Sequence, residues 1–117
     1  MGSLPKRKIG THHVSAIGFG AMSFAGFFGP ADDAVSMQTM ADVLEVGIDF
    51  WDTSNIYGMG RSEALIGQFF AQNPQASKDV VLATKAGIIP GPPRCFDNSE
   101  DYIRADLDAS ITRLTQD

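Results

Sequence analysis

The sequence has little of what several classes of protein depend on. It contains a single cysteine, Cys95, so no disulfide can form within the chain, and a small disulfide-stabilised secreted domain is excluded. Nine lysines and arginines stand against 14 aspartates and glutamates, a formal net charge of −5. Because nucleic-acid binding relies on clustered positive charge, this balance argues against a nucleic-acid partner. The one basic cluster, Lys6 to Lys8, is expected to be a solvated terminal segment.

Long apolar runs are also missing. No stretch approaches the roughly 20 apolar residues that a membrane helix needs. No apolar segment follows the basic N-terminus, as a secretory signal would require. Hydrophobic residues still make up 44% of the 117 residues, which is enough for a packed core in one domain. We therefore expect a soluble, cytoplasmic protein with no membrane partner, in an oligomeric state that composition does not set.

Short apolar runs alternate with longer amphipathic ones. A hairpin is expected first, with strands at 7–9 and 14–16 and its turn at 10–13. Three strands are then expected at 16–20, 48–52 and 80–85. Each is followed by an expected helix, beginning near Asp32 or Asp33, near Ser62 and near Ser99. This α/β order predicts a parallel sheet with right-handed crossovers. It leaves open a doubly wound sheet or part of a (β/α)8 barrel, which in full has about 250 residues.

Apolar residues at helical spacing predict one buried face on each helix. These faces comprise Met37, Met40, Ala41 and Leu44; Leu65, Ile66, Phe69 and Phe70; and Ile103, Leu107, Ile111 and Leu114. Gly47 is expected to end the first helix, and Pro74 lies beyond the end of the second. The segments 21–31 and 87–97 are rich in glycine or proline and are expected to be irregular loops.

Polar side chains mark the carboxyl ends of the second and third expected strands. Asp52 ends one strand and Lys85 ends the other, and neighbouring strands lie about 4.8 Å apart. Tyr57 follows in the loop after Asp52, where it can fold over an Asp52–Lys85 ion pair. A neighbouring ammonium lowers the pKa of a tyrosine, which can then protonate a carbonyl oxygen as hydride reaches the carbon. The three residues therefore predict carbonyl reduction.

The surrounding segments resemble the aldo-keto reductase family. Residues 49–58, with Ser62-Glu63 and 65–67, resemble its signature around the catalytic aspartate and tyrosine, and Leu82 to Lys85 resembles its lysine segment. Gly18 to Met22, with Gly29-Pro30, is similar to its first barrel strand and loop, and Lys8 to Val14 to its N-terminal hairpin. The resemblance covers nearly the whole chain, so we expect a short hairpin followed by the first three β/α units of a TIM (β/α)8 barrel.

The resemblance implies an oxidoreductase that reduces an aldehyde or ketone with NADPH, or runs the reverse alcohol oxidation; NADH is not excluded. It makes Tyr57 the general acid/base, Lys85 the residue that tunes it and Asp52 the orienting carboxylate. Cofactor binding is expected at Gly20, Ala21, Met22, Asp52, Tyr57 and Lys85. A substrate pocket is expected at Phe24, Phe27, Phe28 and Ile56, with Trp51 as a further candidate, although plain packing is equally open for the phenylalanines.

The family's fourth catalytic residue is a histidine after the fourth strand, whereas His12 and His13 fall in the expected hairpin. We expect residues 1–117 to be the N-terminal part of one barrel domain, or a truncated product, with poor activity and marginal stability when alone. The alternative is a non-catalytic nucleotide-binding or regulatory module, or an inactive fragment of such a reductase.

Three further motifs are given simple interpretations. Gly58-Met59-Gly60 does not directly follow a strand and has Glu63 where a dinucleotide-binding loop needs its third glycine. His12 and His13 are adjacent, and adjacent strand residues point to opposite faces, so no metal site is expected. Cys95 has no histidine near it in sequence, and we expect an ordinary loop cysteine.

Overall fold

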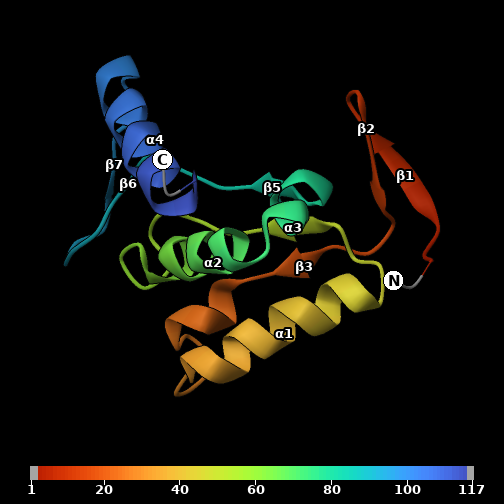
Figure 1. Cartoon of the computed structure of the whole chain (residues 1–117). Helices are drawn as coiled ribbons and strands as arrows, with labels where there is room; N and C mark the ends of the chain where they lie inside the picture. Colours follow the sequence, from red (N-terminus) through yellow and green to blue (C-terminus); the bar gives the residue numbers. More distant parts are fainter. Residues whose placement is uncertain (1–2, 116–117) are drawn as a thin grey trace.

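The structure is a computed structural model that describes residues 3–115. A three-stranded parallel sheet lies at its centre (Figure 1). Its strands are β3 (Phe19–Gly20), β4 (Phe50–Asp52) and β5 (Val81–Ala83), in the order β3-β4-β5. Gly20 pairs with Asp52, and Asp52 with Ala83, so the strand ends are level along one edge. The predicted parallel sheet is confirmed, with strands shorter than the apolar runs that encode them.

Helices α1 (Asp33–Glu45) and α2 (Arg61–Gln72) follow the first two strands. Asp32 caps α1, since its carboxylate accepts a hydrogen bond from the Val35 N–H at 3.0 Å. Gly47 ends α1 as predicted, with φ of 90°, a conformation in which glycine carries no steric penalty. The sequence therefore placed the bounds of α1 within about one residue, which is the usual scatter of helix assignments.

The core lies between the sheet and these two helices. The fully buried Trp51 ring packs against Phe19, Phe69 and Phe70, with ring centroids 5.8 to 5.9 Å apart. The other buried apolar residues around it are Ala21, Phe24, Met40, Leu65, Ile66, Ala76 and Val80. Aromatic contacts of this kind add to the apolar area that is removed from water, so they fix how α2 sits on β4.

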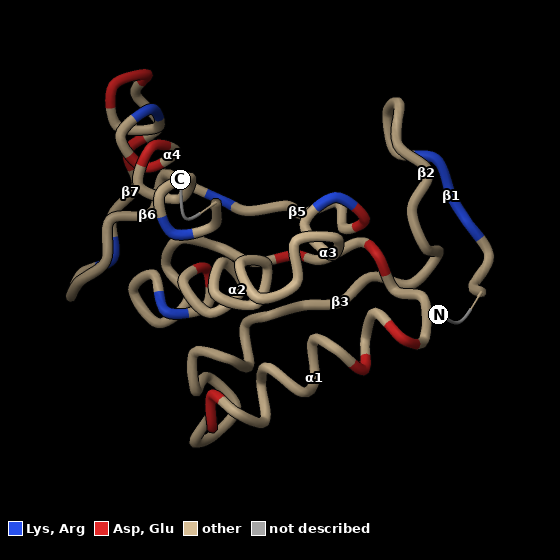
Figure 2. Tube along the Cα trace, viewed as in Figure 1, with Lys and Arg blue, Asp and Glu red and all other residues tan. Residues whose placement is uncertain are grey.

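An antiparallel hairpin of β1 (Lys6–Ile9) and β2 (His12–Ser15) precedes the sheet and projects from it (Figure 1). Ile9 pairs with His12, so the turn is only Gly10-Thr11, and the prediction that both histidines lie in the turn is wrong. Gly10 has φ of 58°, which permits this two-residue turn. The basic residues of β1 lie along this exposed arm (Figure 2). Within residues 3–115, no three His, Cys, Asp or Glu side chains are grouped so that they could hold a metal ion.

Local structure within the expected loops differs from the sequence-based prediction in three places. Met22–Ala25 forms a 3-10 helix, η1, inside the expected loop 21–31. Pro74 begins a short helix, α3 (Pro74–Asp79), because proline lacks only an N–H that the first helical turn leaves unused. The proline-rich segment 87–97 forms a small antiparallel hairpin of β6 (Ile88–Ile89) and β7 (Cys95–Phe96).

The last helix, α4 (Glu100–Thr115), lies against α2. Its predicted N-cap is confirmed, since the Tyr102 N–H donates to the Ser99 hydroxyl at 3.4 Å. Its predicted apolar face is only partly buried: Leu107 and Ile111 remain 49% and 45% exposed. No helix within residues 3–115 is both long and apolar enough to cross a bilayer.

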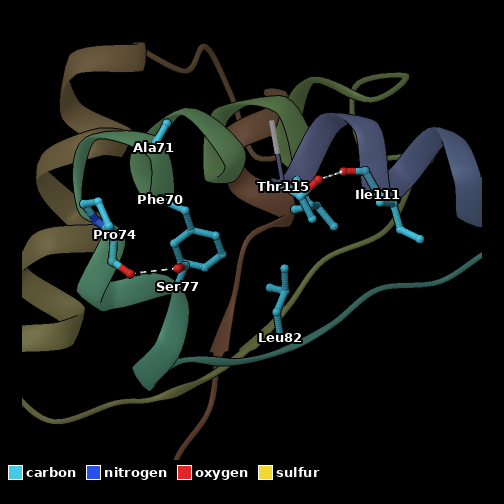
Figure 3. Close-up of a pocket in the computed structure, with 8 residues that line it drawn as sticks. Phe70, Ala71, Pro74, Ser77, Leu82, Ile111 and Thr115 are labelled. Carbon is cyan, nitrogen blue, oxygen red and sulfur yellow. Dashed lines mark hydrogen bonds between the residues drawn. The ribbon is translucent and has the colours of Figure 1, made fainter. Parts of the chain in front are cut away.

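An open apolar hollow of about 550 Å³ is lined by residues of α2, α3, β5 (Val81–Ala83) and α4 (Figure 3). Its lining residues are Phe70, Ala71, Pro74, Ser77, Leu82, Ile111, Leu114 and Thr115. None of these side chains ionises, and both hydroxyls already donate within their own helices, Ser77 to the Pro74 carbonyl and Thr115 to the Ile111 carbonyl. The chemistry of the molecule must therefore be sought elsewhere.

Candidate active site

Three ionisable side chains converge at the carboxyl edge of the sheet. The Lys85 Nζ donates to the Asp52 carboxylate at 2.6 Å and to the Thr53 carbonyl at 2.9 Å. It also lies 3.4 Å from the Tyr57 hydroxyl and 5.1 Å from the centre of the Tyr57 ring. The structure thus brings together Asp52 and Lys85, which the sequence placed at neighbouring strand ends, and Tyr57, which it placed in the loop above them.

The positive charge at this edge belongs to the Lys85 ammonium, and its surroundings keep it protonated. Burial by itself would lower the pKa of Lys85, but the hydrogen bonds and charges of Asp52 and Tyr57 outweigh it, and the pKa is raised above its ordinary value. Both members of the ion pair remain partly exposed, Lys85 at 49% and Asp52 at 44% of their side-chain surface. The ammonium is therefore charged at neutral pH and accessible from the cleft beside it.

Buried hydroxyls fix the loop that carries Tyr57. The Thr53 and Ser62 hydroxyls are 2.8 Å apart, both residues are fully buried, and Ser62 donates onward to the Ala21 carbonyl at 3.0 Å. The ladder of β4 and β5 also continues past the strands, since the Asn55 N–H donates to the Lys85 carbonyl at 3.2 Å. These contacts tie both ends of the Tyr57 loop to β3 and β5. No local sequence pattern predicts these contacts, because the partners are distant along the chain.

A sharp turn directly after Tyr57 leads into α2. Gly58 has φ of 63°, and a Cβ at this position would lie 2.9 Å from the Arg61 Cβ and 3.1 Å from the Ala25 Cβ. Both the backbone conformation and the lack of space require glycine here. The turn sets the direction in which the Tyr57 side chain leaves the backbone, so Gly58 positions the hydroxyl without touching it.

A cleft of about 370 Å³ opens beside Tyr57 and Lys85, within the size range of small-molecule sites. The residues that line it are Met22, Ala25, Phe27, Ser54, Ile56, Tyr57, Gly58, Lys85, Ile88 and Arg94. Of the residues predicted for cofactor or substrate, Met22, Phe27 and Ile56 reach the cleft with Tyr57 and Lys85. Gly20 lies at the exposed end of β3, beside Asp52 in register.

Three predicted pocket residues lie elsewhere. Phe24 is 3% exposed and packs against Phe19, with ring centroids 5.6 Å apart, so plain packing describes it. Trp51 is fully buried in the core, because its side chain leaves β4 on the helix-covered face. Phe28 is 74% exposed and borders a separate shallow hollow. Ala21 is fully buried, so only its backbone is near the strand end.

Sequence reasoning missed five residues of the cleft wall: Ala25, Ser54, Gly58, Ile88 and Arg94. Ile88 and Arg94 belong to the segment 87–97, whose prolines and glycines predicted an irregular loop rather than a folded hairpin. A charged residue inside a proline-rich segment after the Lys85 strand was the only available signal. Arg94 has no hydrogen bond or ion pair within residues 3–115.

A buried ion pair supports the site from behind. Glu63 on α2 is completely buried, and its carboxylate accepts from the Arg113 guanidinium of α4 at 2.8 and 3.2 Å. The Thr84 hydroxyl, one residue before Lys85, donates to the other carboxylate oxygen at 3.2 Å. Glu63 therefore connects α2, α4 and the segment that carries Lys85.

The structure is thus an α/β protein whose parallel sheet has a tyrosine, a lysine and an aspartate together at its carboxyl edge. The family model described as the aldo/keto reductase family matches residues 16–117. The chain belongs to the aldo/keto reductase family. Its β3–α1, β4–α2 and β5–α4 units are the first three β/α units of a TIM barrel, as predicted.

Relatives of known name are matched over about a third of their own length. The chain is 38% identical over 115 residues to the aldo-keto reductase yakc [NADP(+)] of Schizosaccharomyces pombe, covering 96% of this chain and 34% of the relative. It is 35% identical to L-galactose dehydrogenase of Arabidopsis thaliana, covering 89% and 32%. The holo form of aldo-keto reductase AKR11C1 from Bacillus halodurans superimposes with a TM-score of 0.80 at 32% identity, covering 96% and 37%.

Proposed function

We propose that this chain supplies the proton-transfer half of an active site that reduces an aldehyde or ketone with NADPH or NADH, or oxidises the corresponding alcohol. The observation that carries the proposal is the convergence of the Lys85 Nζ on the Asp52 carboxylate and the Tyr57 hydroxyl, at 2.6 and 3.4 Å. The NADP(+) in the name of the Schizosaccharomyces pombe relative supports a nicotinamide cofactor. We further propose that residues 1–117 form the N-terminal part of one barrel domain.

The residues present fit the nicotinamide end of such a cofactor. A Cβ built on Gly20 meets nothing within 4 Å, so the end of β3 leaves open space where Gly20 pairs with Asp52. Met22, two residues further along the chain, lines the cleft. A bound nicotinamide cofactor supplies the hydride for reduction or accepts it in oxidation. Gly20, Met22 and the Asp52–Lys85–Tyr57 cluster are the residues that would hold its ring near the substrate.

Each side chain has a role that its position supports. The Tyr57 hydroxyl faces the cleft and donates its proton to the carbonyl oxygen of the substrate. The Lys85 ammonium then stabilises the negative charge that develops on the phenolate. Asp52 and the Thr53 carbonyl hold the ammonium in place, and the apolar wall of Phe27 and Ile56 limits access of water.

The test compares Tyr57→Phe with Tyr102→Phe, since these two tyrosines are the only ones in the chain. We expect Y57F to reduce the rate of NADPH-dependent reduction of benzaldehyde by at least about 100-fold, because general acid catalysis contributes that much. The control Y102F, on α4, should retain the original rate. Circular dichroism should show that both variants remain folded.

The same variants separate the reductase from the non-catalytic alternative. NADPH binding, followed by its fluorescence, is measured beside turnover. A protein that binds NADPH and whose turnover does not fall in Y57F would contradict the proposed role of Tyr57 and favour a nucleotide-binding module.

A further inference from the structure

The guanidinium of Arg94 is the unpaired charge of the cleft. Arg94 lies directly before β7, is exposed, and lines the same cleft as the Tyr57 hydroxyl and the Lys85 ammonium. Within residues 3–115 it has no acidic partner, whereas Arg61, Arg104 and Arg113 each form an ion pair with a carboxylate. Its charge is therefore available to a ligand.

The balance of charge in the cleft favours an anion. The ammonium of Lys85 is already offset by Asp52 at 2.6 Å. None of the ten residues that line the cleft is acidic, although the chain as a whole has a net charge of −5. A cleft with one uncompensated positive charge inside a negatively charged protein attracts anionic ligands locally while other surfaces repel them.

The remaining wall of the cleft defines the rest of the ligand. Phe27, Ile56 and Ile88 are apolar and lie on three different segments around Tyr57. A ligand that suits these surfaces carries a hydrophobic body between two polar ends, one at the Tyr57 hydroxyl and one at the Arg94 guanidinium. A guanidinium presents parallel N–H donors that match the two oxygens of a carboxylate.

The hairpin that carries Arg94 is anchored at its base. The Asp97 N–H donates to the Gly87 carbonyl at 2.9 Å, and the Gly87 N–H donates to the Asp106 carboxylate of α4 at 3.0 Å. Gly87 has φ of 99°, and a Cβ there would clash with the Asn98 side chain, so the base of the hairpin requires glycine. The backbone that carries Arg94 is thus anchored beside the cleft.

We infer that Arg94 makes this site selective for carbonyl compounds that carry a carboxylate on an apolar body. The inference rests on the proposed reductase function, because it assigns the carbonyl end of the ligand to Tyr57. The carboxylate end depends only on Arg94, so it can be tested by binding without turnover.

The test uses benzoate and benzamide, two probes of nearly equal shape that differ in charge. Each is titrated into the ¹⁵N-labelled chain, and the Arg94 Nε–H signal and backbone signals of the cleft are followed by NMR. We expect benzoate to bind roughly three- to fivefold more tightly than benzamide, the range of a partly exposed ion pair. Added salt should weaken benzoate binding and leave benzamide binding unchanged.

Arg94→Gln should abolish this preference and leave benzamide affinity unchanged. The matched control is Arg104→Gln on α4, which removes the same charge from a residue that pairs with Glu100 away from the cleft; it should keep the preference. Arg94→Lys should retain part of it, since an ammonium attracts the carboxylate without the paired donors.

Equal affinities for the two probes in the original chain would overturn the inference, as would a benzoate preference that survives in R94Q. The latter result would place the anion on Lys85. Loss of reductase activity in Y57F together with no benzoate preference would leave the proposed function standing and remove only the selectivity. A clear Arg94-dependent preference in a protein without turnover would confirm the carboxylate selectivity and remove the proposed reductase function.

Discussion

At the scale of single residues, the Lys85 ammonium organises the candidate site. It has three oxygen neighbours, on Asp52, Thr53 and Tyr57, which match the three N–H donors of an ammonium group. A guanidinium could not converge on the same three oxygens, because its donors lie in one plane. Lysine is therefore the residue type that this geometry requires.

Asp52→Asn is expected to lower the pKa of Lys85. The hydrogen bond with Asp52 is the largest contribution that raises this pKa, ahead of the hydrogen bond with Tyr57, and the charge of Asp52 adds to it. An amide supplies neither the charge nor as strong an acceptor. The measurement is an NMR titration of the Lys85 side chain. As a control, Asp42→Asn on α1, whose carboxylate accepts from Gln38, should leave the titration unchanged.

The sign of the linked stability follows from the raised pKa. The favourable contribution of charged Lys85 is fully present below the ordinary lysine pKa and is lost as the pH rises through the raised value. In D52N, the free energy of unfolding should therefore fall less as the pH rises into the alkaline range than it does in the original chain. An unchanged alkaline limb in D52N would show that Asp52 does not support the ammonium.

At the scale of elements, two ion pairs join segments that are distant in sequence. Glu63 and Arg113 connect α2 to α4. Asp49, directly before β4, pairs with Lys6 of β1 and so connects the β1–β2 hairpin to the sheet. The first is buried and the second is partly exposed. We expect removal of one partner to cost more at the buried pair, because a buried charge without a partner loses its solvation.

Arg113→Met is expected to lower the free energy of unfolding by about 3 kcal/mol, since it leaves the fully buried Glu63 carboxylate without its cation. Urea denaturation measures the loss. The matched control is Arg104→Met on the same helix, where an exposed pair with Glu100 should contribute at most about 0.5 kcal/mol.

A double variant keeps this prediction testable if R113M is too unstable to study. Glu63→Gln combined with R113M removes both charges and should recover part of the lost stability. A double variant less stable than R113M alone would mean that the Glu63 carboxylate is satisfied without Arg113.

Asp49→Asn is expected to destabilise the chain at neutral pH by about 1.5 to 3 kcal/mol, the range for hydrogen bonds that involve a charged group. Burial alone would raise the pKa of Asp49, but the hydrogen bonds from Lys6 and Ser15 outweigh it, and the pKa lies below its ordinary value. The stabilisation is therefore present above the ordinary aspartate pKa and is lost as the pH falls through the lowered value.

The measurement for Asp49 is a series of urea unfolding curves from pH 7 to pH 2. The difference between D49N and the original chain should shrink toward the acid end. Asp108→Asn, on the exposed side of α4, is the matched control and should follow the original chain at every pH. A constant difference over the whole range would assign the effect to something other than ionisation.

At the scale of the whole molecule, much apolar surface stays in contact with water. Within residues 3–115, β3 and β5 each have a strand partner on one side only. Large side chains such as Phe27, Phe28 and Phe96 are about 70% exposed, and the hollow beside α4 is lined by apolar residues (Figure 3). The apolar area removed from water, which is the main favourable term in folding, is thus limited.

We expect the free energy of unfolding of the 117-residue chain to lie at or below about 5 kcal/mol, the lower end of the range for domains. Urea denaturation followed by fluorescence of Trp51, the one tryptophan, measures it from within the core. A free energy of unfolding of about 10 kcal/mol would contradict the expectation and show that the exposed apolar surfaces do not limit the stability of the chain.

The sequence by itself determined the order of the three β/α units and the residues that meet at the carboxyl edge of the sheet. Strands and helix caps are encoded by local sequence patterns, and the ends of neighbouring parallel strands lie at the same edge of a sheet. Asp52, Tyr57 and Lys85 could therefore be placed together from the sequence. Tertiary structure alone decided which aromatic residues face the cleft, how the proline-rich segment folds, and where Arg94 and Glu63 lie. Those outcomes depend on packing between segments far apart in the chain, which no local pattern encodes.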